Sequence, residues 1–167
     1  AAAGKDVTLT NVTHDFVMLG VMGPNSRKLL SELTEADLSN EGFPFGWSKR
    51  IEIAGQTCLA LRMSYVGELG WELYTLNDHA GAVYDAVVEA GEEHGLVLAG
   101  YHAMNSLRLE AGMRHWGHDI TDEDTPLEAG LGFAIDWDKE AFVGRDALLA
   151  QKDQPRTKRL IQIRIED

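Results

Sequence analysis

The sequence predicts an α+β domain, with antiparallel or mixed sheets and helices packed on them. Strand-like and helical runs share the 167 residues, but they do not follow the regular strand–helix–strand alternation of parallel sheets. Hairpin connections replace that alternation, as at Ala54-Gly55 between two short strand patterns. Hydrophobic residues make up 44% of the chain, an ordinary share for a globular protein of this length with a real core.

The first half of the chain is predicted to hold a buried strand, a helix and a hairpin. The apolar run 16–22 fits a buried strand, and the turn at 23–25 opens a helix whose leucines share one side. Residues 37–47 are loop-like because glycine and proline interrupt them. The ranges 49–53 and 56–65 then form the strands of the hairpin.

Two helices are predicted next. Asn77 or Asp78 caps the first, which runs to about His94 and ends before Gly95, a residue suited to the position just past a helix. The second covers about 102–112. Its expected buried face carries Met104, Leu107 and Ala111.

The last part of the chain is predicted to be less regular. A tight loop at 125–130 leads into a strand at 131–137, and a short helix begins within 142–146. A polar linker at 151–157 precedes a further strand that starts at Lys158. Because this strand has no partner in view, we expect the chain to be a piece of a longer polypeptide.

Composition excludes several classes of partner. The formal net charge of −12 argues against nucleic acid and anionic membranes, since both require a basic face. No apolar run approaches the length of a membrane span. Cys58 is the only cysteine, so no intrachain disulfide is possible. The chain also lacks a GxGxxG motif and a Walker lysine, so we expect no phosphate cradle.

The run from Arg114 to Asp119 contains His115 and His118, a spacing that could suggest a metal site. The context is loop-like, and no further ligands follow at a familiar spacing, so we expect no metal here.

Arg108 stands at the edge of the apolar stripe of the second predicted helix. A guanidinium in such a place needs an anionic partner, because burying it unpaired is costly. That partner is either an internal carboxylate, such as Glu110 or Glu128, or a ligand or site carboxylate. The residues alone favour neither alternative.

The stretch 64–74 is the strongest candidate for a site. Two strand-like runs flank a break that carries Gly67 and Gly70, and glycine lets a ligand approach the backbone closely. Tyr65 and Glu72 lie on either side of this break and could form a polar recess. The alternative is structural: Glu72 faces solvent, Tyr65 is an ordinary strand residue and the glycines only serve a hairpin.

The sequence of this stretch resembles the signature of the aminomethyltransferase family, which includes the glycine cleavage T-protein. The matching residues at 65–73 are Tyr-Val-Gly-Glu-Leu-Gly-Trp-Glu-Leu. This stretch is most similar to the folate-binding C-terminal region of sarcosine and dimethylglycine dehydrogenases. The resemblance spans roughly residues 12–165. Further matches are Gly23-Pro24, Asp37 to Phe45, Ser106 to Gly112, Thr125 to Gly130 and Val143-Gly144-Arg145.

The resemblance implies a site for tetrahydrofolate. Glu72 matches the family glutamate that receives the pterin, Tyr65 would stand beside the folate, and Arg108 matches the arginine near the bound cofactor. A pterin presents two adjacent N–H donors, which a carboxylate can accept with its two oxygens. The family's catalytic aspartate lies upstream of the matched segment, so we assign no catalytic residue.

The resemblance also implies the reaction and its partners. FAD on a separate, missing domain of the same polypeptide oxidises an N-methylamine, and the one-carbon unit passes to tetrahydrofolate to give 5,10-methylenetetrahydrofolate. Residues 1–151 would be the folate-binding domain without its N-terminal part, and 152–167 a linker and the first strand of a C-terminal barrel. Such a fragment alone is expected to be inactive. Its location would be the cytoplasm in a bacterium or the mitochondrial matrix in a eukaryote.

Two departures from the family pattern bear on this interpretation. Val66 replaces the threonine of T-proteins and favours the dehydrogenase branch. Asn105 stands where many relatives carry aspartate, which leaves a charge partner for Arg108 open. Two alternatives therefore remain: a T-protein fragment with a lipoyl-protein partner, and a regulatory module that keeps the fold without the chemistry.

Overall fold

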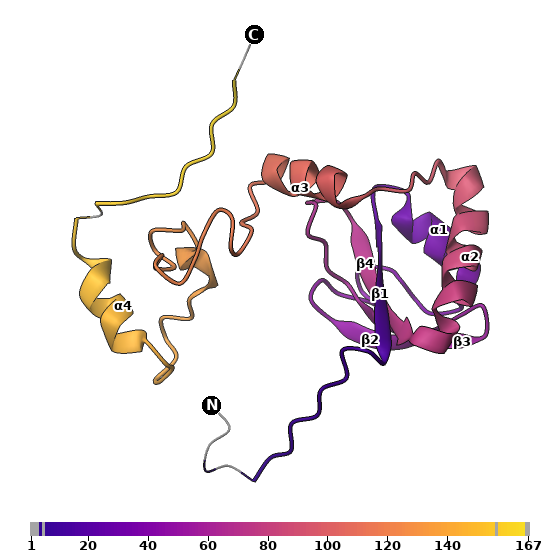
Figure 1. The fold of residues 1–167 in the computed structure, drawn as a ribbon, viewed down its shortest axis with the longest axis horizontal. Helices are drawn as coiled ribbons and strands as arrows, with labels where there is room; N and C mark the ends of the chain where they lie inside the picture. The colour runs from indigo at the N-terminus through magenta and orange to yellow at the C-terminus, as the bar shows by residue number, and fades with distance from the viewer. Residues whose placement is uncertain (1–3, 5, 156, 166–167) are drawn as a thin grey trace. The chain divides into compact units, whose positions relative to one another are not determined.

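The computed structural model describes residues 4, 6–155 and 157–165 (Figure 1). The chain divides into two units, Ala1–Ala111 and Gly112–Asp167. Among the residues described, the first contains an antiparallel sheet with helices, and the second contains loops, a 3-10 turn and one α-helix. The predicted α+β class is confirmed.

The sheet of the first unit has four strands in the order β1-β4-β3-β2. All neighbouring strands are antiparallel. The predicted strand 16–22 is confirmed, whereas the predicted strand 56–65 ends at Leu61, because β2 begins at Ser48, directly opposite. The strands are β1 (Phe16–Met22), β2 (Ser48–Ile53), β3 (Gln56–Leu61) and β4 (Gly70–Leu76).

The predicted hairpin between β2 and β3 is confirmed, with Ala54 and Gly55 at its tip. Both residues have positive φ, 52° at Ala54 and 71° at Gly55. Two positive φ angles in a two-residue loop match the twist of the flanking strands. Glycine adopts this backbone freely, but alanine is strained in it.

One face of the sheet forms the core with two helices. Figure 1 shows α1 (Ser26–Leu33) and α2 (Ala80–Gly91) together on one side of the sheet. The leucines of α1 pack as predicted, since Leu29 and Leu30 are buried. The sheet contributes Val21, Ile51, Ile53, Cys58, Ala60, Trp71 and Leu73 to this core.

The helix predicted from residue 77 to His94 is confirmed as three consecutive segments. Short 3-10 turns, η1 (Asn77–His79) and η2 (Glu92–His94), precede and follow α2. Gly95 then takes the left-handed conformation, with φ 71°. The predicted side-chain cap is wrong: Asn77 instead donates to the backbone oxygen of His14 at 2.5 Å and so ties the helix start to the segment before β1.

The predicted buried face of the next helix, α3 (Tyr101–Glu110), is also wrong. Leu107 is 40% exposed, whereas Arg108 is only 3% exposed. Ala111 is exposed and Met104 is half-buried. The helix lies at the edge of the first unit, away from the α1–α2 layer, so its apolar side chains remain accessible (Figure 1).

The second unit differs most from prediction. The range 131–137 forms a 3-10 turn, η3 (Gly132–Ala134), instead of a strand. The backbone N–H groups of Ala134 and Ile135 donate to Leu131 and Gly132, so these groups bond within the turn. The predicted loop at 125–130 and the last helix, α4 (Arg145–Lys152), are confirmed.

The predicted strand from Lys158 is not formed in the described range 157–165, because no described strand pairs with it. The segment is held by its first residues. Lys158 contacts Asp124 at 2.5 Å, and the Leu160 N–H donates to the backbone oxygen of Glu128 at 2.8 Å. Ile161, Ile163 and Ile165 are exposed.

Relief of strain at the hairpin tip should stabilise the first unit. We expect Ala54→Asn to raise the free energy of unfolding by about 0.5–1 kcal/mol, because asparagine tolerates the left-handed conformation better than alanine. Gly55→Ala, the matched control, should lower it. Urea unfolding followed by circular dichroism measures both, and a less stable Ala54→Asn variant would contradict this account.

The Lys158–Asp124 contact should weaken in acid. The hydrogen bond from Lys158 holds the pKa of Asp124 below its ordinary value of 3.8. A lowered pKa in the folded state contributes stability above the ordinary value, and this contribution is lost as pH falls through the lowered one. Lys158→Met should therefore raise the pKa of Asp124, as measured by NMR titration of its carboxyl carbon. Lys139→Met is the control, and an unchanged titration in Lys158→Met would refute the link.

Candidate functional site

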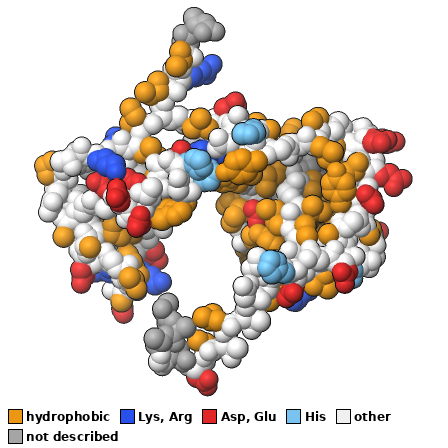
Figure 2. All heavy atoms as spheres, viewed as in Figure 1, with side chains coloured by type: hydrophobic (Ala, Val, Ile, Leu, Met, Phe, Trp, Pro, Cys, Tyr) orange, Lys and Arg blue, Asp and Glu red, His pale blue; other side chains and the backbone are white. Residues whose placement is uncertain are grey.

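The candidate site lies on the sheet face opposite α1 and α2. Alternation along β4 turns Trp71, Leu73 and Thr75 into the core, where each is fully buried. Glu72 and Tyr74 therefore lie on the other face, here called the open face. Figure 2 shows hydrophobic side chains across the visible surface of the first unit. The register places Phe16, Met18, Gly20, Leu59, Leu61, Glu72, Tyr74 and Leu76 on the open face.

Glu72 and Tyr74 are joined by a short hydrogen bond. The Tyr74 hydroxyl donates to Oε2 of Glu72 at 2.7 Å, and both residues are half-buried. This hydrogen bond, with burial and the negative charge of Glu72, raises the pKa of Tyr74, so the phenol stays protonated as a donor. Among the described residues Tyr74 is the only hydrogen-bond partner of Glu72, which leaves Oε1 available to accept from a ligand.

A shallow groove of about 370 Å³ continues from Tyr74 along the open face. Its lining is mostly apolar and includes Phe16, Met18 and Leu59. This apolar groove reaches Tyr74, whose hydroxyl bonds the Glu72 carboxylate. Such an arrangement is suited to a flat ligand with a polar edge, because apolar walls take its rings and the carboxylate can fix its orientation.

Tyr65 is half-buried in the connection between β3 and β4, as are its neighbours Ser64 and Val66. The glycines of this connection have packing roles. A Cβ on Gly67, which has φ +77°, would lie 2.6 Å from Cβ of Ala111, and a Cβ on Gly70 would lie 2.8 Å from the backbone oxygen of Val21. The close approach at Gly67 puts the Tyr65 connection against the end of α3.

Arg108 is bound within its own helix. Its Nε and Nη2 atoms donate to Oδ1 of Asn105 at 2.9 Å and 2.7 Å. The sequence left open whether Asn105 could replace the aspartate of relatives, and the structure shows that its amide oxygen serves as an acceptor. Since Ala111 lies one turn after Arg108, the α3 segment that carries Arg108 neighbours the Tyr65 connection.

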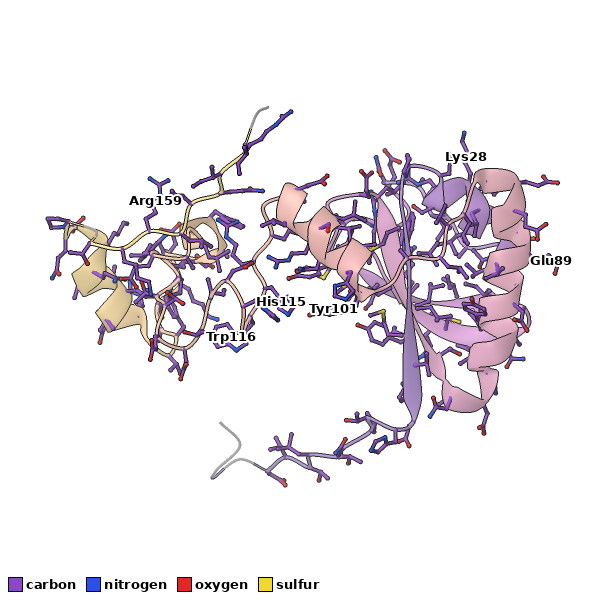
Figure 3. All side chains as sticks on the ribbon, turned by 45° about the horizontal axis from the view of Figure 1, so that its top comes forward. Lys28, Glu89, Tyr101, His115, Trp116 and Arg159 are labelled. Carbon is purple, nitrogen blue, oxygen red and sulfur yellow. The ribbon has the colours of Figure 1, made fainter. Side chains whose placement is uncertain are left out.

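Sequence reasoning missed three residues near this site. Alternation along the strand places Tyr74 on the same face as Glu72, two positions earlier, but no site role was predicted for it. Gly20 gave only the signal of a glycine inside an apolar strand. Figure 3 places Tyr101, at the start of α3, on the side of that helix that faces β1.

The His115–His118 loop of the second unit is a hydrogen-bonded turn in which residues 116–118 are exposed. The two imidazole ring centroids lie 4.4 Å apart with the rings tilted by 46°, and the backbone N–H of His115 donates to Oδ2 of Asp119 at 2.9 Å. Figure 3 labels His115 and Trp116 in this loop. No group of three or more His, Cys, Asp or Glu side chains that could hold a metal occurs among the residues described.

The sequence is matched by the family described as GCVT N-terminal domain, over residues 1–139. The chain belongs to this family. It is 44% identical to human mitochondrial sarcosine dehydrogenase over 160 residues, which are 95% of the chain and 17% of that enzyme. It is 46% identical to 4-methylaminobutanoate oxidase (formaldehyde-forming) of Paenarthrobacter nicotinovorans, over 99% of the chain and 20% of the oxidase.

A solved structure supports the same placement. The aminomethyltransferase T of the Bartonella henselae glycine cleavage system matches this GCVT chain with a TM-score of 0.68 and 28% identity, over 82% of the chain and 36% of that protein. The predicted family resemblance is thus confirmed: the chain is an aminomethyltransferase-like domain related to sarcosine dehydrogenases. It spans about a fifth of the length of the two curated relatives. None of the described helices is both long and apolar enough to cross a membrane.

The acceptor on Asn105 should matter for stability. Asn105→Ala removes the oxygen that receives two hydrogen bonds from the buried Arg108, so we expect the free energy of unfolding to fall by about 1–3 kcal/mol. Asn105→Asp keeps an acceptor oxygen and adds a charge, so it should be at least as stable as the original. Thermal unfolding compares the three proteins, and equal loss in both variants would contradict this role for the acceptor.

Proposed function

We propose that this chain is the tetrahydrofolate-binding, one-carbon-accepting region of an FAD-dependent oxidoreductase of the sarcosine or dimethylglycine dehydrogenase type. The observation that carries the proposal is the position of Glu72, half-buried at the middle of the open face with Oε2 held by Tyr74. Sequence similarity to the dehydrogenase supports the choice of reaction.

The chemistry of the open face fits a reduced pterin. The pterin edge carries adjacent N–H donors, and the Glu72 carboxylate can accept from them with Oε1 and the remaining lone pair of Oε2. The groove lined by Met18 and Leu59 offers apolar contact for flat rings. Tyr65 and Arg108 are proposed as further folate-binding residues, because the connection and the helix that carry them are neighbours.

When bound, tetrahydrofolate would accept the one-carbon unit and leave as 5,10-methylenetetrahydrofolate. The FAD that oxidises the N-methylamine is proposed to lie on another domain of a longer polypeptide. The residues of this chain would bind and orient the folate, and none of them is proposed as a catalytic acid or base. We further propose that residues 1–151 belong to the folate-binding domain and that 152–167 lead into a C-terminal barrel.

A second candidate function differs in the fate of the one-carbon unit. The relative from Paenarthrobacter nicotinovorans is named as a formaldehyde-forming oxidase and is as similar to this chain as the dehydrogenase is. In that case the carbon would be released as formaldehyde. Oxidation of sarcosine or dimethylglycine by the intact polypeptide, with and without tetrahydrofolate, separates the two: free formaldehyde that tetrahydrofolate does not diminish favours the second.

Glu72 should dominate folate affinity. We expect Glu72→Ala to weaken tetrahydrofolate binding by about 2–5 kcal/mol, because the pterin N–H groups lose their charged acceptor. Glu68→Ala is the matched control, since Glu68 is an exposed carboxylate of the neighbouring connection. Anaerobic titration calorimetry on the intact protein measures each affinity. Equal binding by the Glu72→Ala variant and the original protein would reject the proposed site.

A further inference from the structure

Gly20 is a glycine that the fold does not explain. It lies inside β1, where glycine weakens a strand because it adds no packing and has excess conformational freedom. Its φ is not positive, unlike that of Gly23 in the following turn. A Cβ at Gly20 would come within 4 Å only of the end of the Met22 side chain, with Cε at 3.3 Å. Neither backbone geometry nor a rigid neighbour therefore requires glycine here.

Gly70 shows the contrast. It lies opposite Met22 in the same strand pair, and a Cβ on Gly70 would meet the backbone oxygen of Val21 at 2.8 Å and Cα of Met22 at 3.0 Å. Backbone atoms cannot move aside as a flexible side chain can. Gly70 is thus required by packing, whereas the space beside Gly20 is filled only by the flexible end of the Met22 side chain.

That space adjoins the candidate site. Gly20 is the direct cross-strand partner of Glu72, so the two residues share the open face. Cβ atoms of directly opposite residues lie about 4.5–5.5 Å apart, so a side chain at position 20 would stand against the Glu72 carboxylate. On the other side of Glu72, Leu61 of β3 is the partner and supplies an apolar wall. Toward β1, the residue directly opposite Glu72 has no side chain of its own.

We propose that Gly20 determines ligand specificity: its missing side chain lets a flat heterocycle lie across β1 with its N–H edge against Glu72. Tyr74 holds Oε2 of the carboxylate from the next position on the same face. This inference rests on the proposed function and specifies which part of the open face takes the pterin ring.

Met22 covers this space with a movable group. Its Cε and Sδ atoms reach back over Gly20, and the Ser64 hydroxyl contacts Sδ at 3.6 Å. An unbranched thioether adjusts its rotamers easily, so an entering ring can displace its end without moving the backbone. A β-branched residue at position 20 would be fixed in place and would leave the ring no room.

The test uses side chains of increasing size at position 20 in the intact protein. Tetrahydrofolate affinity, measured by anaerobic calorimetry, should fall about twofold in Gly20→Ala and about tenfold or more in Gly20→Val, as expected for overpacking a fitted site. The melting temperature should stay level or rise by about 1–4 °C, because replacing a strand glycine removes a local weakness. A purely structural role would lower affinity and melting temperature together.

Gly81→Ala is the matched control, since Gly81 lies in α2 and a Cβ there meets nothing within 4 Å. It should match Gly20→Ala in stability and leave affinity unchanged. Unchanged affinity in Gly20→Val beside weakened binding in Glu72→Gln would overturn this inference and leave the proposed function intact. A fall of several degrees in the melting temperature of Gly20→Ala would overturn it too. If the original protein did not bind tetrahydrofolate, the proposed function and this inference would both fail.

Discussion

The position of Trp71 in the core fixes the rest of the first unit. Its fully buried ring lies under two guanidinium groups, those of Arg27 at 5.8 Å and Arg62 at 5.9 Å. Both guanidiniums also donate to Oδ1 of Asn40, each at 2.8 Å, so α1, the loop before β2 and the end of β3 meet around one indole. Side chains alternate along a strand, and a slip of one residue in β4 would bury Glu72 and expose Trp71. The site therefore depends on this anchor.

The surroundings of Glu72 explain why the open face would select its ligand. A carboxylate among apolar side chains loses hydration, and the hydrogen bond from Tyr74 offsets only part of that loss. A ring that covered the face without donating to Oε1 would leave the charge buried and poorly paired, at a cost of about 1–3 kcal/mol or more. Ligands that bring N–H groups avoid this cost. Discrimination would thus come from penalising the wrong ligand as much as from attracting the right one.

Local patterns predicted most of the first unit but little of the second. Alternation and turn residues identified β1, the β2–β3 hairpin and the helix that ends at Gly95. The strand predicted at 131–137 was wrong, and the strand predicted from Lys158 is not formed within the described range 157–165, because a strand needs a neighbour, which a local pattern cannot supply. The motif located Glu72 and Tyr65, the helix pattern and the family resemblance located Arg108, and their folate role stays a prediction. Gly20 was missed because its proposed role depends on its pairing with Glu72, a residue far away in sequence.

The strand order also constrains how the domain assembles. β2 and β3 are joined by a two-residue turn, so we expect them to pair early, whereas β1 and β4 can meet only after the chain between Met22 and Gly70 closes into a loop. The free-energy cost of that closure is offset only when α1 and α2 also pack on the sheet. Gly20 and Glu72 come together in this late step. An incompletely folded chain would therefore carry the whole signature motif but would lack the open face on which Gly20 and Glu72 lie together. Ligand binding would then indicate that folding is complete.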